Sequence, residues 1–392
     1  MKVALVRYRY TPHGGAERYL DGLLAGLRTA GAEITLLTAS WEGKGASGIP
    51  VVRIPVPHRP APLRLLLFAR AARAWAEVNP EWLLFSLERV PGAEVYRAGD
   101  GCHAEWLLRK KPLRPVSWPL DWIRPLSRTY LALERGMFLS PRLRAVIANS
   151  GRGREDIVRH FRVPREKIAV IYNGVDTSEF PLDGKPAARR FLREQFGIRN
   201  EETVFLFVGS GFGRKGVGVL VDASVHLTRR GVPFRVIVVG KGNAGPYLRV
   251  AHQGGAGGRI HFTGPVAGAR DFFLGADAFV FPTLYEPFSN ACLEAMAAGL
   301  PVVTTAVNGA SEVLREGESG YVVDDPLDAD ALADRMERLL SPDRRASMGA
   351  AARRTAERHT RERNISETMA VLSRVWAEKT GAGGGSSRGV VY

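Results

Sequence analysis

The chain has little cysteine and no long apolar run, and these absences exclude several classes of protein. Among its 392 residues are 2 cysteines, Cys102 and Cys292, which lie far apart and outside any CxxC or Cys/His cluster. A disulfide scaffold or a structural zinc site is therefore not expected, and a reducing cytosol fits this cysteine content best. No apolar stretch approaches the roughly 18 residues of a membrane span, and the first residues do not resemble a signal peptide. We expect a soluble cytosolic protein.

Acidic residues are scarce relative to basic ones. The 55 lysines and arginines oppose 40 aspartates and glutamates, which leaves a net charge of +15. Such an excess predicts an anionic partner: nucleic acid, a phosphorylated substrate or an acidic membrane surface. No recognisable nucleic-acid-binding module is present, so we expect no nucleic acid. A hydrophobic content of 45% is typical of a globular protein and excludes wholesale disorder.

Short apolar runs alternate with helical patterns along nearly the whole chain. The runs expected to form buried strands are 3–6, 34–37, 82–85, 145–148, 204–208, 236–239, 278–281 and 302–303. Unbroken runs of this kind are typical of parallel sheets with helices on both faces. Between them lie amphipathic helices, of which the first carries Leu20, Leu23, Leu24 and Leu27 on one face. The pattern predicts doubly wound α/β domains.

A weak internal duplication indicates two such domains. The strand at 3–6 leads through Gly14 and Gly15 into a helix, and the strand at 204–208 leads through a second glycine loop into another. We expect an N-terminal domain over 1–176, a C-terminal domain over 177–375 and a flexible tail over 376–392. In such domains ligands bind at the carboxyl ends of the strands, so a ligand is expected in a cleft that the two domains face.

The most specific motif is the segment 285–301. It predicts a loop, a helix over about 290–298 and a stop at Gly299. The free N–H groups at the start of such a helix favour an anion. Glu286 precedes the helix and Glu294 lies about one turn inside it, so we expect the two carboxylates to have different roles. Taken without the surrounding segment, they would be a loop carboxylate and a solvated helix residue.

A second motif is the glycine loop at 209–216. Its glycines let a phosphate approach the backbone, and Arg214 and Lys215 supply positive charge. The spacing mimics a dinucleotide fingerprint, but no acidic residue follows at the usual distance of about 20 residues. The loop is not a Walker loop either, because Lys215 is followed by Gly216 rather than Ser or Thr. We expect it to neutralise a phosphate.

Two further segments have the features of a site. Gly14 and Gly15 form a glycine turn at the entry to the first helix. Asp100 and His103, flanked by small residues, follow the strand-like run 94–97. An acid and a histidine in this position are typical of catalytic groups, whereas a lone histidine is more often structural.

On these motifs the chain resembles the retaining glycosyltransferases of family 4, which have the GT-B architecture of two Rossmann-like domains around a cleft. Glu286-x7-Glu294 matches the paired glutamates of that family, and 209–216 matches its Arg-Lys donor-phosphate loop. Within the family the chain is most similar to the lipopolysaccharide core glucosyltransferases that act on inner-core heptose. The segments that carry this similarity are 8–15, 40–43, 212–217 and 299–307. The resemblance covers about residues 1–375.

The resemblance implies roles for individual residues. Arg214 and Lys215 would bind the donor diphosphate, Glu294 would bond the nucleotide ribose, and Glu286 would approach the transferred sugar. The other implied donor-binding positions are Gly14, Gly15, Gly213, Val266, Phe288, Ser289 and Asn290. Ser289 stands where the wider family often has glycine, which affects the finer contacts to the sugar.

The acceptor side leaves two candidates. Asp100 matches an acidic position of the family, whereas many members have a histidine in this region, so His103 is its rival. The resemblance further implies transfer of a hexose, with glucose from UDP-glucose as the favoured donor, to a lipopolysaccharide core or related glycolipid. It implies retention of configuration without a metal or other cofactor. The one Asp-x-Asp pair, Asp328 and Asp330, opens a predicted helix, so capping explains it better than metal binding.

A basic and aromatic stretch extends from residue 107 to 144. Nine basic residues there oppose only Asp121 and Glu134, and three tryptophans surround or interrupt them at 106, 118 and 122. A second basic and apolar stretch surrounds 65–68. Because basic residues gain about 1 kcal/mol each near an anionic bilayer, we favour peripheral attachment of the N-terminal domain to the inner face of the cell membrane. The alternative is a solvated basic face with its tryptophans in the core.

A nucleotide-sugar epimerase is the alternative function, because that class shares the two-domain scaffold. It needs no acceptor, so donor turnover to a free epimer would indicate it. A dehydrogenase is disfavoured by the missing ribose-binding acid. A non-catalytic binding protein is disfavoured by the presence of both glutamates together with the Arg-Lys pair.

Overall fold

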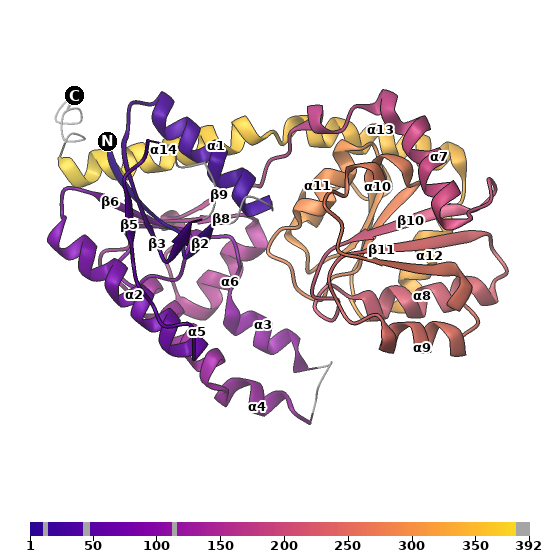
Figure 1. Ribbon diagram of the computed structural model, residues 1–392, viewed down its shortest axis with the longest axis horizontal. Helices are drawn as coiled ribbons and strands as arrows, with labels where there is room; N and C mark the ends of the chain where they lie inside the picture. Colours follow the sequence, from indigo (N-terminus) through magenta and orange to yellow (C-terminus); the bar gives the residue numbers. More distant parts are fainter. Residues whose placement is uncertain (11–14, 42–47, 112–115, 382–392) are drawn as a thin grey trace, which may run out of the picture. The chain divides into compact units, whose positions relative to one another are not determined.

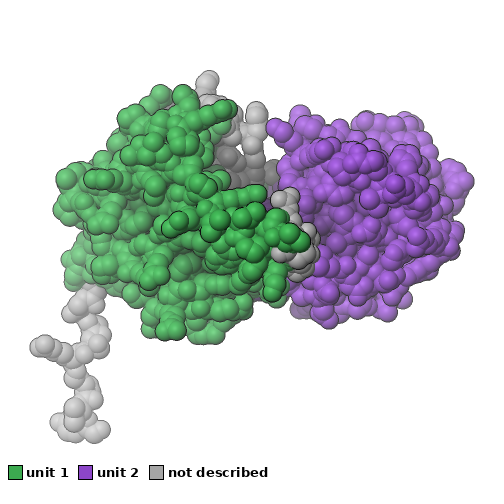
Figure 2. All heavy atoms as spheres, turned by 90° about the horizontal axis from the view of Figure 1, so that it is seen from below, with its two compact units in different colours: residues 1–172, 361–392 green, residues 173–360 purple. Residues whose placement is uncertain are grey.

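The protein is described from a computed structural model, which covers residues 1–10, 15–41, 48–111 and 116–381 (Figure 1). The chain forms two compact units, Met1–Tyr172 with Arg361–Tyr392, and Asn173–Thr360 (Figure 2). Each unit contains one large parallel sheet, as the alternation of apolar runs and helices predicts. In the described ranges no helix combines the length and apolar content needed to cross a bilayer.

The first unit is built on a seven-stranded sheet of order β5-β3-β1-β6-β7-β8-β9, in which all pairs are parallel. Its strands are β1 (Lys2–Val6), β3 (Glu33–Thr38), β5 (Val51–Arg53), β6 (Leu83–Ser86), β7 (Val95–Ala98), β8 (Ala145–Ala148) and β9 (Ile168–Val170). A separate two-stranded sheet pairs β2 (Arg9–Tyr10) with β4 (Ser40–Trp41). The ends of β1 and β7 therefore lie at the same carboxyl edge of the large sheet.

Helices cover both faces of this sheet. They are α1 (Gly15–Thr29), α2 (Ala61–Val78), α3 (His103–Arg109), α4 (Trp118–Ile123), α5 (Pro125–Phe138), α6 (Gly151–Phe161) and α14 (Arg361–Thr380). Val3 and Leu5 of β1 pack in a cluster with leucines of α1 and with Leu372 of α14. Ala4 and Val6, on the opposite face, pack with Phe68 of α2. Because successive strand residues point to opposite faces, both covered, the run at 3–6 is apolar throughout.

The second unit has a six-stranded parallel sheet of order β12-β11-β10-β13-β14-β15. Its strands are β10 (Thr203–Val208), β11 (Phe234–Val239), β12 (Ile260–Gly264), β13 (Ala278–Phe281), β14 (Val302–Thr305) and β15 (Gly320–Val323). Its α-helices are α7 (Lys185–Phe196), α8 (Val217–Arg229), α9 (Gly245–Gln253), α10 (Arg270–Gly275), α11 (Asn290–Ala297), α12 (Ala329–Arg338) and α13 (Pro342–Arg358). In Figure 1, α8, α9 and α12 lie on one side of the sheet and α7, α10, α11 and α13 on the other.

Short 3-10 turns connect several of these elements. They are η2 (Arg165–Lys167), η3 (Thr177–Glu179), η4 (Leu182–Gly184), η5 (Gly257–Arg259) and η6 (Gly309–Val313).

The last helix, α14, belongs to the first unit although it follows the second in sequence. A Cβ at Gly22 or Gly26 of α1 would lie 2.7 or 2.6 Å from a methyl carbon of Ile365, so the two helices meet closely where α1 has no side chain. Lys379, near the end of α14, donates to both carboxylate oxygens of Glu94, at 2.9 and 2.7 Å. The close packing of α14 on two glycines of α1 and its buried ion pair with Glu94 thus hold this helix in the first unit.

This arrangement corrects the expected domain limits. The units divide after residue 172 rather than 176, and residues 361–375 join the first unit instead of the second. The expected flexible tail begins too early, because α14 continues to Thr380. The pattern of a helix carries no information on which of two sheets it covers, so the return of α14 was not foreseen.

Candidate active site

The glycine loop at 209–216 connects β10 to α8, as the sequence predicts. One of its glycines, Gly216, is required by the neighbouring backbone, and Gly209 is favoured by a neighbouring side chain. Gly216 has φ +76°, and a Cβ there would lie 1.7 Å from the Pro282 carbonyl oxygen. A Cβ at Gly209 would lie 2.9 Å from Cδ of Lys215, so this glycine makes room for the lysine stem.

Gly213 differs from these two glycines. Its φ is not in the left-handed region, and a Cβ there would meet no atom within 4 Å. It is also exposed. The fold therefore places no steric constraint on this glycine.

The structure brings Arg214, Lys215 and Glu286 together, although about 70 residues separate the loop from the glutamate. One carboxylate oxygen of Glu286 lies 3.3 Å from Nη1 of Arg214 and 3.4 Å from Nζ of Lys215. Nη1 of Arg214 also donates to the Tyr285 carbonyl at 3.0 Å, and Nζ of Lys215 lies 5.0 Å from the centre of the Phe281 ring. Two cations share one carboxylate, so the cluster keeps a net positive charge that favours an anion.

The two paired glutamates lie in different elements, as expected. The Glu286 amide donates to the Val307 carbonyl at 3.3 Å, and its carbonyl accepts from Gly309 at 2.9 Å. Glu286 is therefore fixed in a bridge with Asn308 before the helix. Glu294 lies half-buried inside α11, which begins at Asn290 and ends at Ala297 as the motif predicts.

A buried asparagine that the sequence analysis missed holds the start of α11. Asn308 is 0% exposed, and its Oδ1 accepts from the backbone N–H groups of Ser289 at 3.2 Å and Ala310 at 3.1 Å. Its Nδ2 donates to the Thr304 hydroxyl at 2.9 Å. A signal was present, because Asn308 lies shortly after a buried strand and directly before the turn η6, where an asparagine is a common cap.

This asparagine modifies one expectation. The Ser289 amide, expected among the backbone groups for a donor sugar or phosphate, donates to Asn308 instead. Phe288 is buried at 5% exposure, and the side chain of Asn290 accepts from Nδ2 of Asn173 at 2.7 Å. In the free protein these positions therefore shape the helix start through internal contacts.

Val266 lies on the loop that follows β12 and is 36% exposed. Because β12, β11 and β10 are parallel neighbours, this loop and the glycine loop leave the sheet at the same edge. The contact of Val266 with the nucleotide base stays a prediction. Asp328 caps α12 by accepting from Ala331 N at 2.8 Å, which confirms the capping interpretation.

In the first unit, Asp100 and His103 follow β7 at the carboxyl edge of the sheet. Two residues that the sequence analysis did not single out as site residues hold this segment. Glu134 accepts from the His103 amide at 2.7 Å and from Nε of Arg89 at 2.9 Å. Nη1 of Arg89 lies 3.7 Å from Oδ2 of Asp100 and its Nη2 donates to the Gly101 carbonyl at 3.0 Å. Nothing local in the sequence announces this long-range pairing.

The two acceptor-side candidates have different environments. The Asp100 side chain is 71% exposed and open to solvent. The His103 ring lies 5.0 Å from the ring of Tyr130, and its buried Nε2 has no hydrogen-bond partner in the described part of the chain. Burial, followed by the positive charges of Arg89 and Lys110, lowers the pKa of His103 to about 4. His103 is therefore neutral near pH 7.

The glycine turn of the first unit is described only in part. Gly15 is the first residue of α1, whereas Gly14 lies outside the described residues. Arg114 of the basic stretch also lies outside them.

The described part of the basic and aromatic stretch includes the end of α3 and all of α4 and α5. Trp106, Trp118 and Trp122 are half-buried rather than in the core, and Lys110 and Lys111 place ammonium groups 5.3 and 5.5 Å from the rings of Trp106 and Trp118. Large apolar side chains are exposed on α4, α5, the preceding segment and the neighbouring helix α2: Leu63, Leu66, Leu67, Val116, Leu120, Ile123 and Leu126. The surface is therefore apolar as well as basic.

Comparison with known proteins gives consistent matches over both units. Residues 188–355 match the family model described as glycosyl transferases group 1, and residues 13–179 match that of glycosyltransferase family 4. Over 342 residues the chain is 26% identical to lipopolysaccharide glucosyltransferase WaaG of Escherichia coli, covering 87% of this chain and 90% of that protein. It is 28% identical over 365 residues to an uncharacterised glycosyltransferase of Methanocaldococcus jannaschii, covering 87% of this chain and 89% of that protein.

Solved structures show the same fold. The crystal structure of WaaG matches with a TM-score of 0.78 at 24% identity, covering 95% of this chain and 99% of that chain. Anabaena HepE in complex with UDP and glucose matches with a TM-score of 0.71 at 20% identity, covering 95% of this chain and 99% of that chain. Two Rossmann-like units of parallel sheet with helices on both faces agree with this likeness.

Proposed function

The chain belongs to the GT-B glycosyltransferases, with a family 4 and a group 1 domain, and on this premise we propose that it is a retaining hexosyltransferase that uses a nucleotide-sugar donor. The observation that carries the proposal is the cluster of Arg214, Lys215 and Glu286 at the exposed glycine loop. We further propose glucose from UDP-glucose as the transferred sugar and a lipopolysaccharide core or related glycolipid as the acceptor. The name of the E. coli relative and the UDP and glucose in the HepE complex support this choice.

The proposed chemistry follows from charge. Cleavage of the bond between the sugar C1 and the diphosphate oxygen leaves negative charge on the diphosphate and positive character on the sugar. Arg214 and Lys215 stabilise the former, and one well-placed donor of this kind contributes about 3 kcal/mol to lowering the barrier. The acceptor hydroxyl oxygen bonds to C1 on the face that the diphosphate leaves, and its proton passes to the departing phosphate oxygen. Two protein cations supply the positive charge, so we propose that no metal is needed.

A panel of nucleotide sugars, offered with and without truncated core lipid, tests this proposal. We expect UDP release that depends on the acceptor, a product whose anomeric configuration by NMR equals that of the donor, and full activity in EDTA. Turnover of the donor to a free epimer without acceptor would indicate the epimerase instead. Inversion of configuration or an obligate requirement for Mn²⁺ would contradict the mechanism.

We also propose that the first unit attaches peripherally to an anionic membrane surface through α2, α4 and α5. These helices expose apolar side chains, and α2 and α5 also carry arginines. The aromatic rings with lysine ammonium groups over them favour a bilayer interface. A lipid-linked acceptor would be presented at that surface. A cytoplasmic enzyme at the inner face of the cell membrane would have this property.

Vesicle co-sedimentation tests the attachment. We expect binding to vesicles that contain phosphatidylglycerol, little binding to pure phosphatidylcholine, and a loss on replacing both Leu120 and Ile123 by Ser. Val250, which is also exposed but lies on α9 of the second unit, gives the matched control Val250→Ser. Equal binding to neutral and anionic vesicles, or an equal loss in the control, would contradict the proposal.

A further inference from the structure

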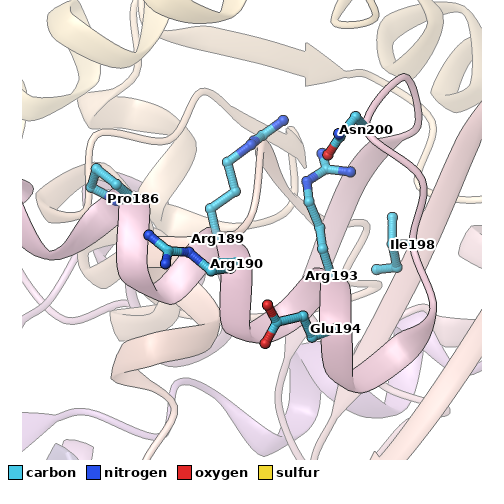
Figure 3. A pocket seen from close by; sticks show the side chains of 7 residues that line it. All are labelled: Pro186, Arg189, Arg190, Arg193, Glu194, Ile198 and Asn200. Atoms are coloured by element: carbon cyan, nitrogen blue, oxygen red, sulfur yellow. The ribbon is translucent and has the colours of Figure 1, made fainter.

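The second unit has a pocket of about 390 Å³ along α7 that is separate from the glycine loop. Arg189, Arg190, Arg193 and Glu194 of α7 line it, and Ile198 and Asn200 close its far end (Figure 3). Arg193 bonds to Asp277, which directly precedes β13, so the pocket lies toward the amino ends of the strands. The glycine loop leaves the opposite, carboxyl end of β10.

One carboxylate, that of Asp277, lies close to several guanidinium groups, two of which belong to arginines that line this pocket. Asp277 pairs with Nη1 of Arg189 and, at 3.3 Å, with Nη2 of Arg193, and it lies 3.9 Å from Nε of Arg345. It also accepts from the Val204 amide at 2.8 Å. The pairing anchors α7 to the sheet, and three guanidinium groups share the Asp277 carboxylate, with Glu202 as a further negative charge that acts on Arg193.

Burial and neighbouring positive charge both act on these arginines. Burial, followed by the positive charge of Arg189, lowers the pKa of Arg193. Burial also lowers the pKa of Arg345, and Arg189 again acts in the same direction against Asp277. An anion placed among these groups would lower their mutual repulsion.

Arg190 is not part of the anchor. Its side chain lines the pocket and is exposed, and within the described ranges it forms no ion pair. Arg193, by contrast, is 8% exposed, and Figure 3 shows its side chain rising beside that of Arg189 toward Asn200. The pocket thus combines two arginines held rigidly in place with one that is free to close on a ligand.

The remaining lining residues restrict the ligand. The carboxylate of Glu194 repels negative charge, so a ligand that is negatively charged along its whole length is disfavoured. Ile198 offers an apolar contact. A phosphate monoester satisfies both, because its phosphate can face the arginines while its hydroxyl-bearing or carbon part meets Glu194 and Ile198. We propose that the α7 pocket binds the phosphate group of a phosphate monoester, carried either by a small soluble ester or by a phospholipid headgroup.

Calorimetric titration of the full chain with glycerol 3-phosphate tests this proposal. The Lys215→Ala background removes the lysine of the glycine loop, so that binding there does not obscure the pocket. In that background we expect Arg190→Glu to weaken binding at least tenfold, while Arg249→Glu, an equal charge change at an exposed position of α9, leaves it unchanged. Co-sedimentation with vesicles containing phosphatidic acid, using the same variants, assigns the source of the phosphate.

A second variant guards against an indirect effect of Arg190→Glu on folding. Asn200→Asp adds a negative charge at the other end of the pocket without touching α7, and we expect it to weaken binding of the same probe in the same direction. Unchanged unfolding midpoints confirm that both variants fold. Binding that survives both substitutions in both arms, or that Arg249→Glu weakens equally, overturns the proposal.

Discussion

Lys215 is the side chain on which the donor hypothesis depends most directly. Its ammonium group shares the Glu286 carboxylate with Arg214, and this carboxylate keeps its pair with Arg214 when the lysine is removed, so we expect the substituted protein to remain folded. We expect Lys215→Ala to lower hexose transfer by about 10²- to 10³-fold, because one donor to the leaving group is lost. The measurement is the initial rate at saturating donor, alongside the thermal unfolding midpoint.

Arg249→Ala is the matched control for this substitution, since it removes a cation from an exposed position of the same unit. We expect it to leave the rate unchanged. Full activity in purified Lys215→Ala would refute the role of the lysine. Binding of UDP to this variant would not change that conclusion.

His103 allows a prediction that is independent of activity. Its pKa of about 4 lies below the usual value of 6.5, so its ring signals in an NMR titration should move near pH 4. Because the unfolded chain binds this proton at higher pH than the folded one, stability attributable to His103 falls as the pH drops from about 6.5 toward 4.

His103→Gln identifies the signal and should reduce this acid-dependent loss of stability. An ordinary titration near pH 6.5 would show that the ring is solvated, and the burial described here would be wrong.

A substitution of Asp100 by Asn, compared with His103→Gln, shows which group acts on the acceptor. It is the group whose loss lowers the maximal rate more strongly.

At the scale of elements, Gly216 and Gly213 of the glycine loop differ in what a methyl group would meet. Gly216→Ala forces a methyl group into the Pro282 carbonyl at a positive φ, so we expect poor folding or a much lower unfolding midpoint. Gly213→Ala meets no neighbour and should keep the parental midpoint. If the donor phosphate approaches this backbone, Gly213→Ala nevertheless raises the KM for the nucleotide sugar. An unchanged KM would place the ligand elsewhere.

The elements themselves were largely predictable from the sequence. Strands such as β1, β8 and β13 could be predicted because both faces are covered, which makes every residue of the run apolar. α11 could be predicted because its capping region and Gly299, with φ +66°, mark its limits. Contacts such as that of Asn308 to Ser289 were not predictable in detail, since they join a turn to a helix 19 residues away.

At the scale of the whole molecule, α14 offers the sharpest test. Lys379→Met removes the ammonium group from Glu94, a buried carboxylate that, among the described residues, keeps the Leu84 amide at 3.1 Å and Arg144 at 3.8 Å. Because breaking a buried pair leaves an uncompensated charge, we expect a loss of about 3 kcal/mol in the free energy of unfolding of the first unit.

Hydrogen exchange measures this loss separately for β6 and for the strands of the second unit. Only the first unit should exchange faster. Arg374→Met is the control on the same helix, because its pair with Glu378 is exposed and contributes little. Equal protection in Lys379→Met and the parent would show that α14 does not stabilise the first sheet.

The sequence does not show which of the two units each segment joins. Composition and turns predicted a boundary after residue 176, which is within a few residues of the observed division after residue 172. They did not show that residues 361–375 cover the first sheet, because the apolar stripe of a helix fits either sheet equally well. The close contact of Gly22 and Gly26 with Ile365 becomes visible only in three dimensions.

Because α14 belongs to the first unit, it affects the order in which the two units fold during translation. On the ribosome, residues 173–360 emerge as one uninterrupted stretch and can mature as a body of their own, since domains generally fold as units. Meanwhile the earlier-made leucines of α1, together with Val3 and Leu5, lack the cover that residues 361–380 will give them. The first unit is translated first but is completed last. Until residues 361–380 are available, its sheet is incompletely covered and is the part of the nascent chain most exposed to aggregation.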